Sequence, residues 1–273
     1  MRAASRAVRT QNRTLGFVPT MGALHEGHLS LVRAAKSKCD YVAASIFVNP
    51  TQFGPNEDFS KYPRTFEKDS ELLKNAGVDF LFAPTPDEMY PKGAVTWVTV
   101  EGLSDKLDGK SRPGHFRGVT TVVSKLFHIV EPDIAFFGQK DAVQLVLIRR
   151  MVRDLNMAVE IVGCPIIRET DGLAMSSRNT YLSPRERKSA TVLNRTLREI
   201  KQQFDQGERS STKLLSAGME IFKQEPGARL DYLEIVDLET LDPLTRINGE
   251  ALLAIAAYVG TTRLIDNERL QIP

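Results

Sequence analysis

The first 165 or so residues alternate between short apolar segments of strand character and longer segments of helical periodicity. The clearest strand is Tyr41–Val48, a continuous apolar run with β-branched residues, which is typical of a strand buried on both faces. Further strands are predicted at Thr14–Pro19, Val78–Ala83, Val95–Val100 (at a sheet edge), Asp133–Phe137 and Val159–Cys164, and helices at Leu29–Lys38, Phe66–Asn75, Val119–Val130 and Asp141–Asn156. Repeated strand–helix–strand units predict an α/β fold, a doubly wound parallel sheet with helices on both faces.

The pattern changes after Asp171. Ser183-Pro184 is typical of a helix start, and the helix is expected to run to about Gln206. A second helix is predicted at Thr212–Lys223, followed by strands at Leu230–Val236, Ala251–Val259 and Arg263–Leu270. We therefore expect residues 1–166 to form the parallel-sheet domain and residues 167–273 a smaller α+β domain.

Composition excludes several classes of protein. The net charge of +2 is too small to indicate binding to nucleic acid or to a membrane surface. No apolar run reaches the roughly 18–20 residues that a membrane span needs. The two cysteines, Cys39 and Cys164, adjoin apolar segments and are expected to be reduced, which suits a cytoplasmic protein. The basic first residues, MRAASRAVRTQNR, are weakly similar to a transit peptide, but a basic helix or a ragged end is favoured.

Two of the four histidines stand at a predicted strand-to-helix junction, in FVPTMGALHEGHLSLV. A helix N-terminus attracts anions, because its first N–H groups lack helical partners. His25 and His28 are three residues apart and should point the same way, so both could donate hydrogen bonds to a phosphate. Gly27 would let a ligand approach the backbone closely.

Other roles for His25 and His28 remain open. They could be surface or capping residues. A metal pair is the other alternative, although zinc-binding helices usually space histidines four apart and no third ligand is obvious. We favour the phosphate site.

Two further segments suit a nucleotide. Gly138-Gln139-Lys140-Asp141 follows a strand and opens a helix, so that Lys140 could meet a phosphate and Asp141 a ribose hydroxyl. Met175-Ser176-Ser177-Arg178-Asn179 follows the domain boundary, and Arg178 could bind a triphosphate bidentately. Taken alone, the first segment could be an ordinary loop followed by an acidic first helical turn, and the second could be a solvated linker.

Amide side chains mark a possible pocket for a second substrate. Gln52 lies in Asn49-Pro50-Thr51-Gln52, after the buried strand, and offers both a donor and an acceptor. Gln144 lies one turn into the helix after Lys140 and is predicted to face the same crevice, although either amide could instead face the solvent. The basic segment Gly114–Gly118 is expected to be a loop that lines the site or an oligomer contact.

The loops that carry these groups follow strands, at residues 19–28, 49–64 and 138–140. Ligands of parallel sheets bind beyond the carboxyl ends of the strands, so we expect the three loops to converge.

These motifs closely resemble those of the pantoate–β-alanine ligase (pantothenate synthetase) family. The resemblance rests on FVPTMGALHEGH, SIFVNPTQFGPNEDFSKYPRT, PGHFRGVTTVVSKLF, FFGQKDAVQL and DGLAMSSRN, which span most of residues 15–183 in the family's order. The C-terminal third matches only loosely. The resemblance implies a Rossmann-like nucleotidyltransferase fold with a HIGH-type signature, distantly shared with class I aminoacyl-tRNA synthetases. Ala174 stands where those synthetases have the first lysine of their mobile loop.

The resemblance also implies roles for individual residues. His28, His25, Lys140 and Arg178 would be catalytic, with both histidines stabilising charge at the α-phosphate. Pantoate and β-alanine would meet Gln52, Gln144 and Asn49. ATP would contact Met21, Gly22, Ala23, Leu24, His25, Glu26, Gly27, His28, Gly138, Gln139, Lys140, Asp141, Ile167, Met175, Ser176, Ser177 and Arg178.

The implied reaction joins pantoate to β-alanine through pantoyl adenylate, with ATP and Mg²⁺, and releases AMP and pyrophosphate. The Mg²⁺ ligands are not identified, and Asp69 is one candidate. The resemblance also implies a homodimer formed through the N-terminal domain. Two other functions remain open: another nucleotidylyltransferase of this fold, and a non-catalytic ATP-binding module. The amide side chains suit a small hydroxy acid, which argues against another nucleotidylyltransferase. The presence of His25, His28, Lys140 and Arg178 argues against a non-catalytic module, so we favour the ligase.

Overall fold

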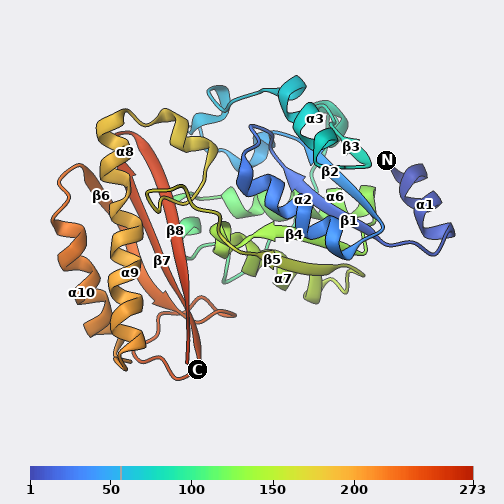
Figure 1. The fold of residues 1–273 in the computed structure, drawn as a ribbon. Helices are drawn as coiled ribbons and strands as arrows, with labels where there is room; N and C mark the ends of the chain where they lie inside the picture. The colour runs from blue at the N-terminus through green and yellow to red at the C-terminus, as the bar shows by residue number, and fades with distance from the viewer. Residues whose placement is uncertain (56, 273) are drawn as a thin grey trace. The chain divides into compact units, whose positions relative to one another are not determined.

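Five parallel strands form the sheet of the N-terminal part of the chain. The computed structural model describes residues 1–55 and 57–272. The strands are β1 (Leu15–Thr20), β2 (Tyr41–Ile46), β3 (Phe80–Phe82), β4 (Ile134–Gly138) and β5 (Glu160–Cys164). Their order is β3-β2-β1-β4-β5, with every neighbouring pair parallel (Figure 1). This arrangement confirms the predicted doubly wound sheet.

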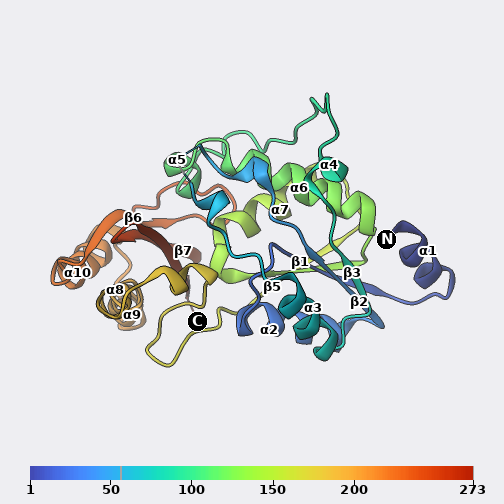
Figure 2. The same ribbon diagram turned by 90° about the horizontal axis from the view of Figure 1, so that it is seen from above.

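Helices cover both faces of this sheet. Figure 2 shows α2 and α3 on one side and α6 and α7 on the other. The helices are α1 (Arg2–Thr10), α2 (Glu26–Lys38), α3 (Phe66–Asn75), α4 (Pro86–Met89), α5 (Asp108–Ser111), α6 (His115–Val130) and α7 (Ala142–Asp154). Short 3-10 turns are η1 (Pro50–Gln52), η2 (Asp58–Ser60) and η3 (Gln139–Asp141). No helix in residues 1–55 and 57–272 is long and apolar enough to cross a membrane.

The core between α2 and the sheet follows from helical spacing. Leu31, Val32 and Ala35 form the buried face of α2. They pack in one cluster with Val18 of β1 and Phe136 of β4. This packing fixes the start of α2 relative to the carboxyl ends of both strands.

The predicted edge strand at Val95–Val100 is wrong, because the segment has no strand partner in the described chain. Helix α6 supplies its hydrogen bonds instead. The Val98 N–H donates to the hydroxyl of Thr121 at 3.0 Å, and the hydroxyl of Thr120 donates to the Val98 carbonyl at 2.6 Å. Side-chain hydroxyls thus satisfy backbone groups that the sequence predicts to pair with a neighbouring strand.

The C-terminal part of the chain is built from helices and an antiparallel sheet. Its elements are η4 (Ser177–Tyr181), α8 (Pro184–Ala190), α9 (Val192–Asp205), α10 (Ser211–Lys223), β6 (Ala228–Val236), β7 (Glu250–Val259) and β8 (Thr262–Gln271). The sheet order is β6-β7-β8. The predicted α+β architecture is confirmed.

One predicted helix of this part is two helices. Ser183 caps α8 with Glu186 as predicted, but α8 ends at Ala190 instead of continuing to Gln206. The N–H and the hydroxyl of Thr191 both donate to the Lys188 carbonyl, three residues back. These bonds tighten the turn to 3-10 geometry and interrupt the α-helical pattern.

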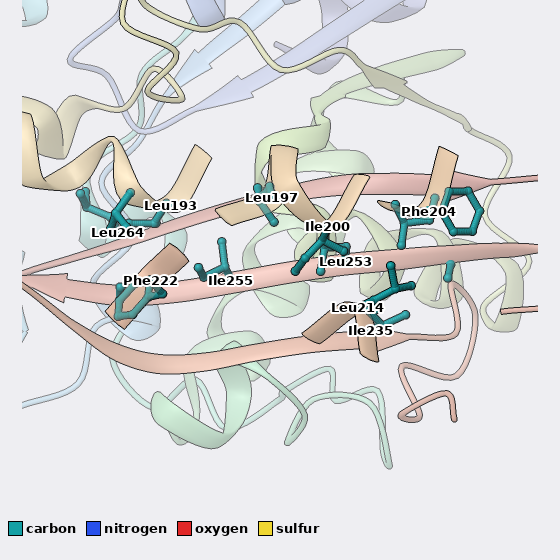
Figure 3. Close-up of a cluster of buried hydrophobic side chains, with 14 of the residues drawn as sticks. Leu193, Leu197, Ile200, Phe204, Leu214, Phe222, Ile235, Leu253, Ile255 and Leu264 are labelled. Atoms are coloured by element: carbon teal, nitrogen blue, oxygen red, sulfur yellow. The ribbon is translucent and has the colours of Figure 1, made fainter. Parts of the chain in front are cut away.

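Apolar side chains from α9 and α10 cover one face of this sheet (Figure 3). Leu193, Leu197, Ile200 and Phe204 recur every three or four residues along α9, so they form one stripe.

The backbone groups into two compact units. One contains residues 1–139 and 144–165, and the other residues 140–143 and 166–273. The predicted boundary placed residues 140–143 in the first domain, whereas here they group with the second unit.

Candidate active site

The strand order reverses beside β1, where β2 lies on one side and β4 on the other. Ligands of such sheets bind in the crevice at this switch point, beyond the carboxyl ends of the strands. The segment Met21–His28 follows β1 and Gln139 follows β4, while the Phe47 N–H after β2 donates to the Thr20 carbonyl. In the first unit, the ends of β1, β2 and β4 therefore carry the predicted site loops at one edge of the sheet.

A carboxylate from α3 shapes the loop after β1. Asp69 is only 1% exposed, and its two oxygens accept the N–H groups of Ala23 and Leu24, both at 2.8 Å. The Thr65 hydroxyl donates to the same carboxylate at 3.1 Å. Both oxygens are thus occupied by loop and helix donors. Asp69 is therefore a loop anchor, and its hydrogen-bonded oxygens argue against the predicted role as a Mg²⁺ ligand.

The same anchor explains the glycine of this loop. Gly22 has φ of +84°, where L residues are strained, and a Cβ there would lie 3.0 Å from Oδ2 of Asp69. Ala23 also has positive φ, +51°, and its N–H bond to Asp69 holds it there. The backbone bends sharply enough to place His25 at the start of α2.

The two histidines cap helix α2 reciprocally. Nδ1 of His25 accepts from the N–H of Gly27 at 3.1 Å, and Nδ1 of His28 accepts from the N–H of His25 at 3.3 Å. This is the geometry of a capping box, with an imidazole in each position. The helix predicted at Leu29–Lys38 starts three residues earlier, at Glu26, with His25 as N-cap. The capping role that the sequence left open is therefore real.

Capping also fixes the tautomer of both rings. A neutral imidazole has one donor and one acceptor nitrogen, so an Nδ1 that accepts leaves the proton on Nε2. The ring centroids of His25 and His28 are 4.2 Å apart, as expected for side chains that point the same way. The helix start thus presents imidazole N–H donors, and two of its backbone N–H groups are used for capping rather than for an anion. Capping and anion binding are compatible because they use different ring atoms.

The described residues contain no group of three or more histidine, cysteine, aspartate or glutamate side chains that could hold a metal ion. The alternative of a metal pair at His25 and His28 therefore finds no third protein ligand in residues 1–55 and 57–272.

A hydrogen-bonded amide network lies at the end of β2. Asn49 is buried and caps η1, and its Nδ2 donates to Oε1 of Gln52 at 3.1 Å and to the Gly118 carbonyl at 3.2 Å. Gln52 in turn directs Nε2 to the sulfur of Met21, 2.9 Å away. Gln52 thus joins the loop after β2 to the loop that carries the histidines. Gln144, on α7, is half-buried in the same unit.

The predicted loop at Gly114–Gly118 is in fact the start of helix α6, with Gly114 as its N-cap. The helix lies directly against the amide network: a Cβ at Gly118 would come within 2.4 Å of the Thr51 carbonyl oxygen. Nδ1 of His115 lies 2.8 Å from the Gln52 carbonyl. The segment therefore supports the backbone of Gln52.

Arg112 completes this support. Its guanidinium donates to both carboxylate oxygens of Glu57, and its Nη1 lies 3.0 Å from Nε2 of His115. Burial alone would raise the pKa of Glu57, but the hydrogen bonds and charge of Arg112 outweigh it and hold this pKa below its usual value. The Gln52 carbonyl can only accept, so Nδ1 of His115 is its donor, and Nε2 faces the Arg112 guanidinium.

The second unit contains the other predicted nucleotide segments. Lys140 pairs with Asp141 at 3.5 Å, and the Lys140 carbonyl accepts from Nδ2 of Asn267 on β8. Met175 donates its N–H to the carbonyl of Ile167, which makes the two segments the sides of a hairpin. Ser176 caps η4 by accepting from the Arg178 N–H at 3.3 Å.

A neighbouring ion pair braces this hairpin. Asp266 is buried on β8 and binds Arg168 bidentately at 2.7 and 3.0 Å. Arg168 also donates to the Gly172 carbonyl in the turn. Strand β8 thus holds the hairpin through Asp266 and the Lys140 segment through Asn267.

Three of these supporting residues were not predicted from the sequence: Arg112, Asp266 and Asn267. Their partners lie tens of residues away, so no local pattern marks them. Of these residues, Arg112 had some local indication in the sequence, because it lies two residues before the basic segment that begins at Gly114.

Comparison with known proteins places this geometry in a family. The family model described as pantoate-beta-alanine ligase matches residues 1–269. A pantothenate synthetase of Acidobacterium capsulatum is 64% identical over 255 residues, covering 93% of this chain and 85% of the relative. The pantothenate synthetase of Koribacter versatilis is 58% identical over 271 residues, covering 99% and 93%.

Solved structures agree with these relatives. The crystal structure of pantothenate synthetase from Thermus thermophilus has a TM-score of 0.93 and 49% identity, and 98% of each chain is covered. The pantoate-beta-alanine ligase from Francisella tularensis, complexed with Beta-gamma ATP and Beta-alanine, has a TM-score of 0.78 and 36% identity, covering 97% of this chain and 94% of that one. The predicted family and fold class are confirmed, and this chain belongs to the pantoate–β-alanine ligase family.

Proposed function

We propose that this chain condenses pantoate with β-alanine at the expense of ATP, giving pantothenate, AMP and pyrophosphate. Its relatives carry the name of this activity, and the Francisella tularensis structure is complexed with Beta-gamma ATP and Beta-alanine. The observation that carries the proposal is the pair of capping imidazoles at the sheet's switch point, in the unit that also holds the Gln52 amide network.

The reaction proceeds in two steps. In the first, a pantoate carboxylate oxygen attacks the α-phosphorus of ATP, a new P–O bond forms, and the bond to pyrophosphate breaks. In the second, the amine of β-alanine attacks the acyl carbon of pantoyl adenylate, AMP leaves with the acyl C–O bond pair, and the amine loses a proton. The protein supplies no covalent bond in either step, so positioning and electrostatics must provide the acceleration.

The imidazoles act on the first step. Negative charge grows on the α-phosphate oxygens as the carboxylate attacks, and the Nε2–H groups of His25 and His28 donate to those oxygens. Their Nδ1 atoms are held by backbone N–H groups, so the rings need no reorganisation when charge develops.

The remaining predicted nucleotide residues bind the rest of ATP. Lys140 and Arg178 would supply cations to the phosphates, Gly138 to Asp141 would meet phosphate and ribose, and Ile167 would lie beside the adenine. The segments Met21–His28 and Met175–Arg178 would provide the remaining contacts to ATP. Mg²⁺ usually remains on substrate phosphates with few protein ligands. We therefore place it on the triphosphate and assign it no protein ligand.

Pantoate is assigned to the amide network. Gln52 uses its Oε1 for Asn49, while its Nε2 meets the thioether sulfur of Met21, which is a weak acceptor. A carboxylate or hydroxyl oxygen is a better partner for this amide nitrogen. Gln144 would bind the same acid, and β-alanine would enter next to Gln52.

The proposal also covers the oligomeric state of the chain and its location in the cell. We infer a homodimer formed through the first unit, which exposes the large apolar side chains of Leu81, Val95 and Trp97. We infer a cytoplasmic enzyme, which the buried free thiols of Cys39 and Cys164 support.

A pair of substitutions tests the role of His28 separately from its capping role. In His28→Asn, the amide oxygen occupies the position of Nδ1 and still accepts from the His25 N–H, but the Nε2–H donor is lost. We expect single-turnover formation of pantoyl adenylate to fall about 100-fold or more, with little change in Tm. His28→Ala removes both contacts and should lower the rate and the Tm together.

The readout is pyrophosphate release from ATP, first with pantoate alone and then with β-alanine. Adenylate formation in His28→Asn at the rate of the unmodified chain would refute the phosphate role. Release of pyrophosphate that does not depend on pantoate would favour another nucleotidylyltransferase, and ATP binding without release would favour a non-catalytic module.

A further inference from the structure

Tyr90 reaches the amide network from outside all the predicted site motifs. It follows helix α4, and its hydroxyl donates to Oδ1 of Asn49 at 2.9 Å. The Thr51 hydroxyl lies 2.9 Å from the same Oδ1. The Tyr90 ring is held by Phe47 on one side and lies 5.4 Å from Nζ of Lys125. The side chain is therefore held by contacts from two segments, the loop after β2 and helix α6.

The orientation of the Asn49 amide follows from two backbone groups whose chemistry is unambiguous. The Gly118 carbonyl can only accept, so the group 3.2 Å from it is the amide nitrogen. The Thr51 N–H can only donate, so the group 3.4 Å from it is the amide oxygen. The Tyr90 hydroxyl meets that oxygen and must act as a donor.

The orientation is passed on to Gln52. Since Nδ2 of Asn49 faces Gln52, the atom that meets it is the acceptor Oε1. The Gln52 nitrogen then lies on the other side of its amide, beside Met21 in the loop that carries the histidines. The orientation of Asn49, to which the Tyr90 hydroxyl adds a further hydrogen bond, thus decides which end of the Gln52 amide faces a ligand.

We propose that Tyr90 is a positioning residue for the acid substrate. Its hydroxyl donates to Oδ1 of Asn49 and so helps the Gly118 carbonyl and the Thr51 N–H to hold this amide, which presents the Gln52 nitrogen as a donor to the carboxylate or hydroxyl of pantoate. The proposal rests on the assignment of Gln52 to the pantoate pocket. It extends that pocket to a residue that touches no substrate.

The protonation state of Tyr90 suits this role. Burial raises the pKa of its hydroxyl, and the hydrogen bonds with Thr51 and Asn49 only partly offset this rise. The phenol therefore remains a donor throughout the neutral and mildly alkaline range.

Tyr90→Phe is the test, because it removes one hydroxyl and keeps the ring. We expect KM for pantoate to rise about three- to tenfold, the loss of one well-placed hydrogen bond, while KM for ATP stays unchanged. Tyr41→Phe is the matched control. Tyr41 stands at the opposite end of β2, its ring contacts Phe80, and its substitution should leave both constants unchanged.

A double-mutant cycle separates positioning from simple packing. In the Asn49→Ala background there is no amide to orient, so adding Tyr90→Phe should raise KM for pantoate no further. A rise of equal size in both backgrounds would overturn the proposal, as would a Tyr90→Phe enzyme that matches Tyr41→Phe.

The Gln52→Ala variant separates the assignment of Gln52 to the pantoate pocket from the role of Tyr90. An unchanged KM for pantoate in Gln52→Ala would remove Gln52 from the pocket and overturn the Tyr90 role with it. A raised KM in Gln52→Ala beside an unaffected Tyr90→Phe would keep the pocket and overturn the Tyr90 role alone.

Discussion

At the scale of single residues, the chemistry of this chain depends on which atom of a side chain is already occupied. His25 and His28 use Nδ1 for the helix start and keep their protons on Nε2. Gln52 uses Oε1 for Asn49. In each case a neighbouring hydrogen bond makes the other polar atom of the group a donor, and donors are what an anionic substrate requires.

Cys39 provides a prediction that depends on pH. Burial, followed by the nearby carboxylates of Asp133 and Asp40, raises the pKa of its thiol to about 11 from a usual value of 9.0. Between these values the folded chain holds a proton that the unfolded chain releases, so this contribution to stability is complete below about pH 9 and declines as the pH rises toward 11.

Only the thiolate is nucleophilic, so Cys39 of the native chain should react with iodoacetamide at about pH 8.5 at least tenfold more slowly than in the denaturant-unfolded chain. Mass spectrometry of the tryptic peptide gives both rates. Equal rates in the two states would show that the thiol is accessible and unperturbed in the fold.

At the scale of elements, α3 controls the histidine loop through one carboxylate. Asp69→Asn leaves one acceptor oxygen for the N–H groups of Ala23 and Leu24, so one buried donor loses its partner. We expect a loss of about 1–3 kcal/mol in the free energy of unfolding, measured by urea denaturation, and slower adenylate formation. Glu67→Gln is the control, since it removes an exposed charge from the same helix turn. A drop of the same size in both variants would mean that charge at the helix start, and not the loop bond, stabilises the chain.

Elements were predictable from sequence where local pattern and tertiary context agree. Helix α3 lies at the predicted Phe66–Asn75, because apolar spacing and Gly77 both indicate it. The Val95–Val100 segment has the composition of a strand, but threonine hydroxyls of α6 satisfy its backbone.

The residues of the site also fall into a group that local sequence predicts and a group that it does not. The proximity of His25 and His28 follows from their spacing, whereas the anchor Asp69 and the positioning residue Tyr90 act across 45 and 41 residues of chain and leave no local pattern.

At the scale of the whole molecule, the inferred homodimer predicts a concentration-dependent mass. Val95 is 82% exposed and Trp97 42%, in a segment of the first unit that is exposed over most of its length. Val95→Asp should shift the chain toward the monomer in light scattering at micromolar concentration, because a buried charge without a partner disfavours association.

Leu155→Asp is the matched control, since Leu155 is also exposed in the first unit and its substitution should leave the mass unchanged. A monomer in the unmodified chain would contradict the dimer, and an equal effect of both substitutions would indicate general destabilisation.

The double role of His25 and His28 limits which substitutions the site can accept. Enzymes commonly trade stability for activity, so that replacing a catalytic group makes the fold more robust. Here the imidazoles that we propose to meet the phosphate also cap the start of helix α2. Loss of either ring without a replacement acceptor at the position of Nδ1 removes a cap and a donor in one event, and a frayed helix start would be inactive as well as unstable. Selection for turnover and selection for a well-formed first turn therefore act on the same two side chains and in the same direction.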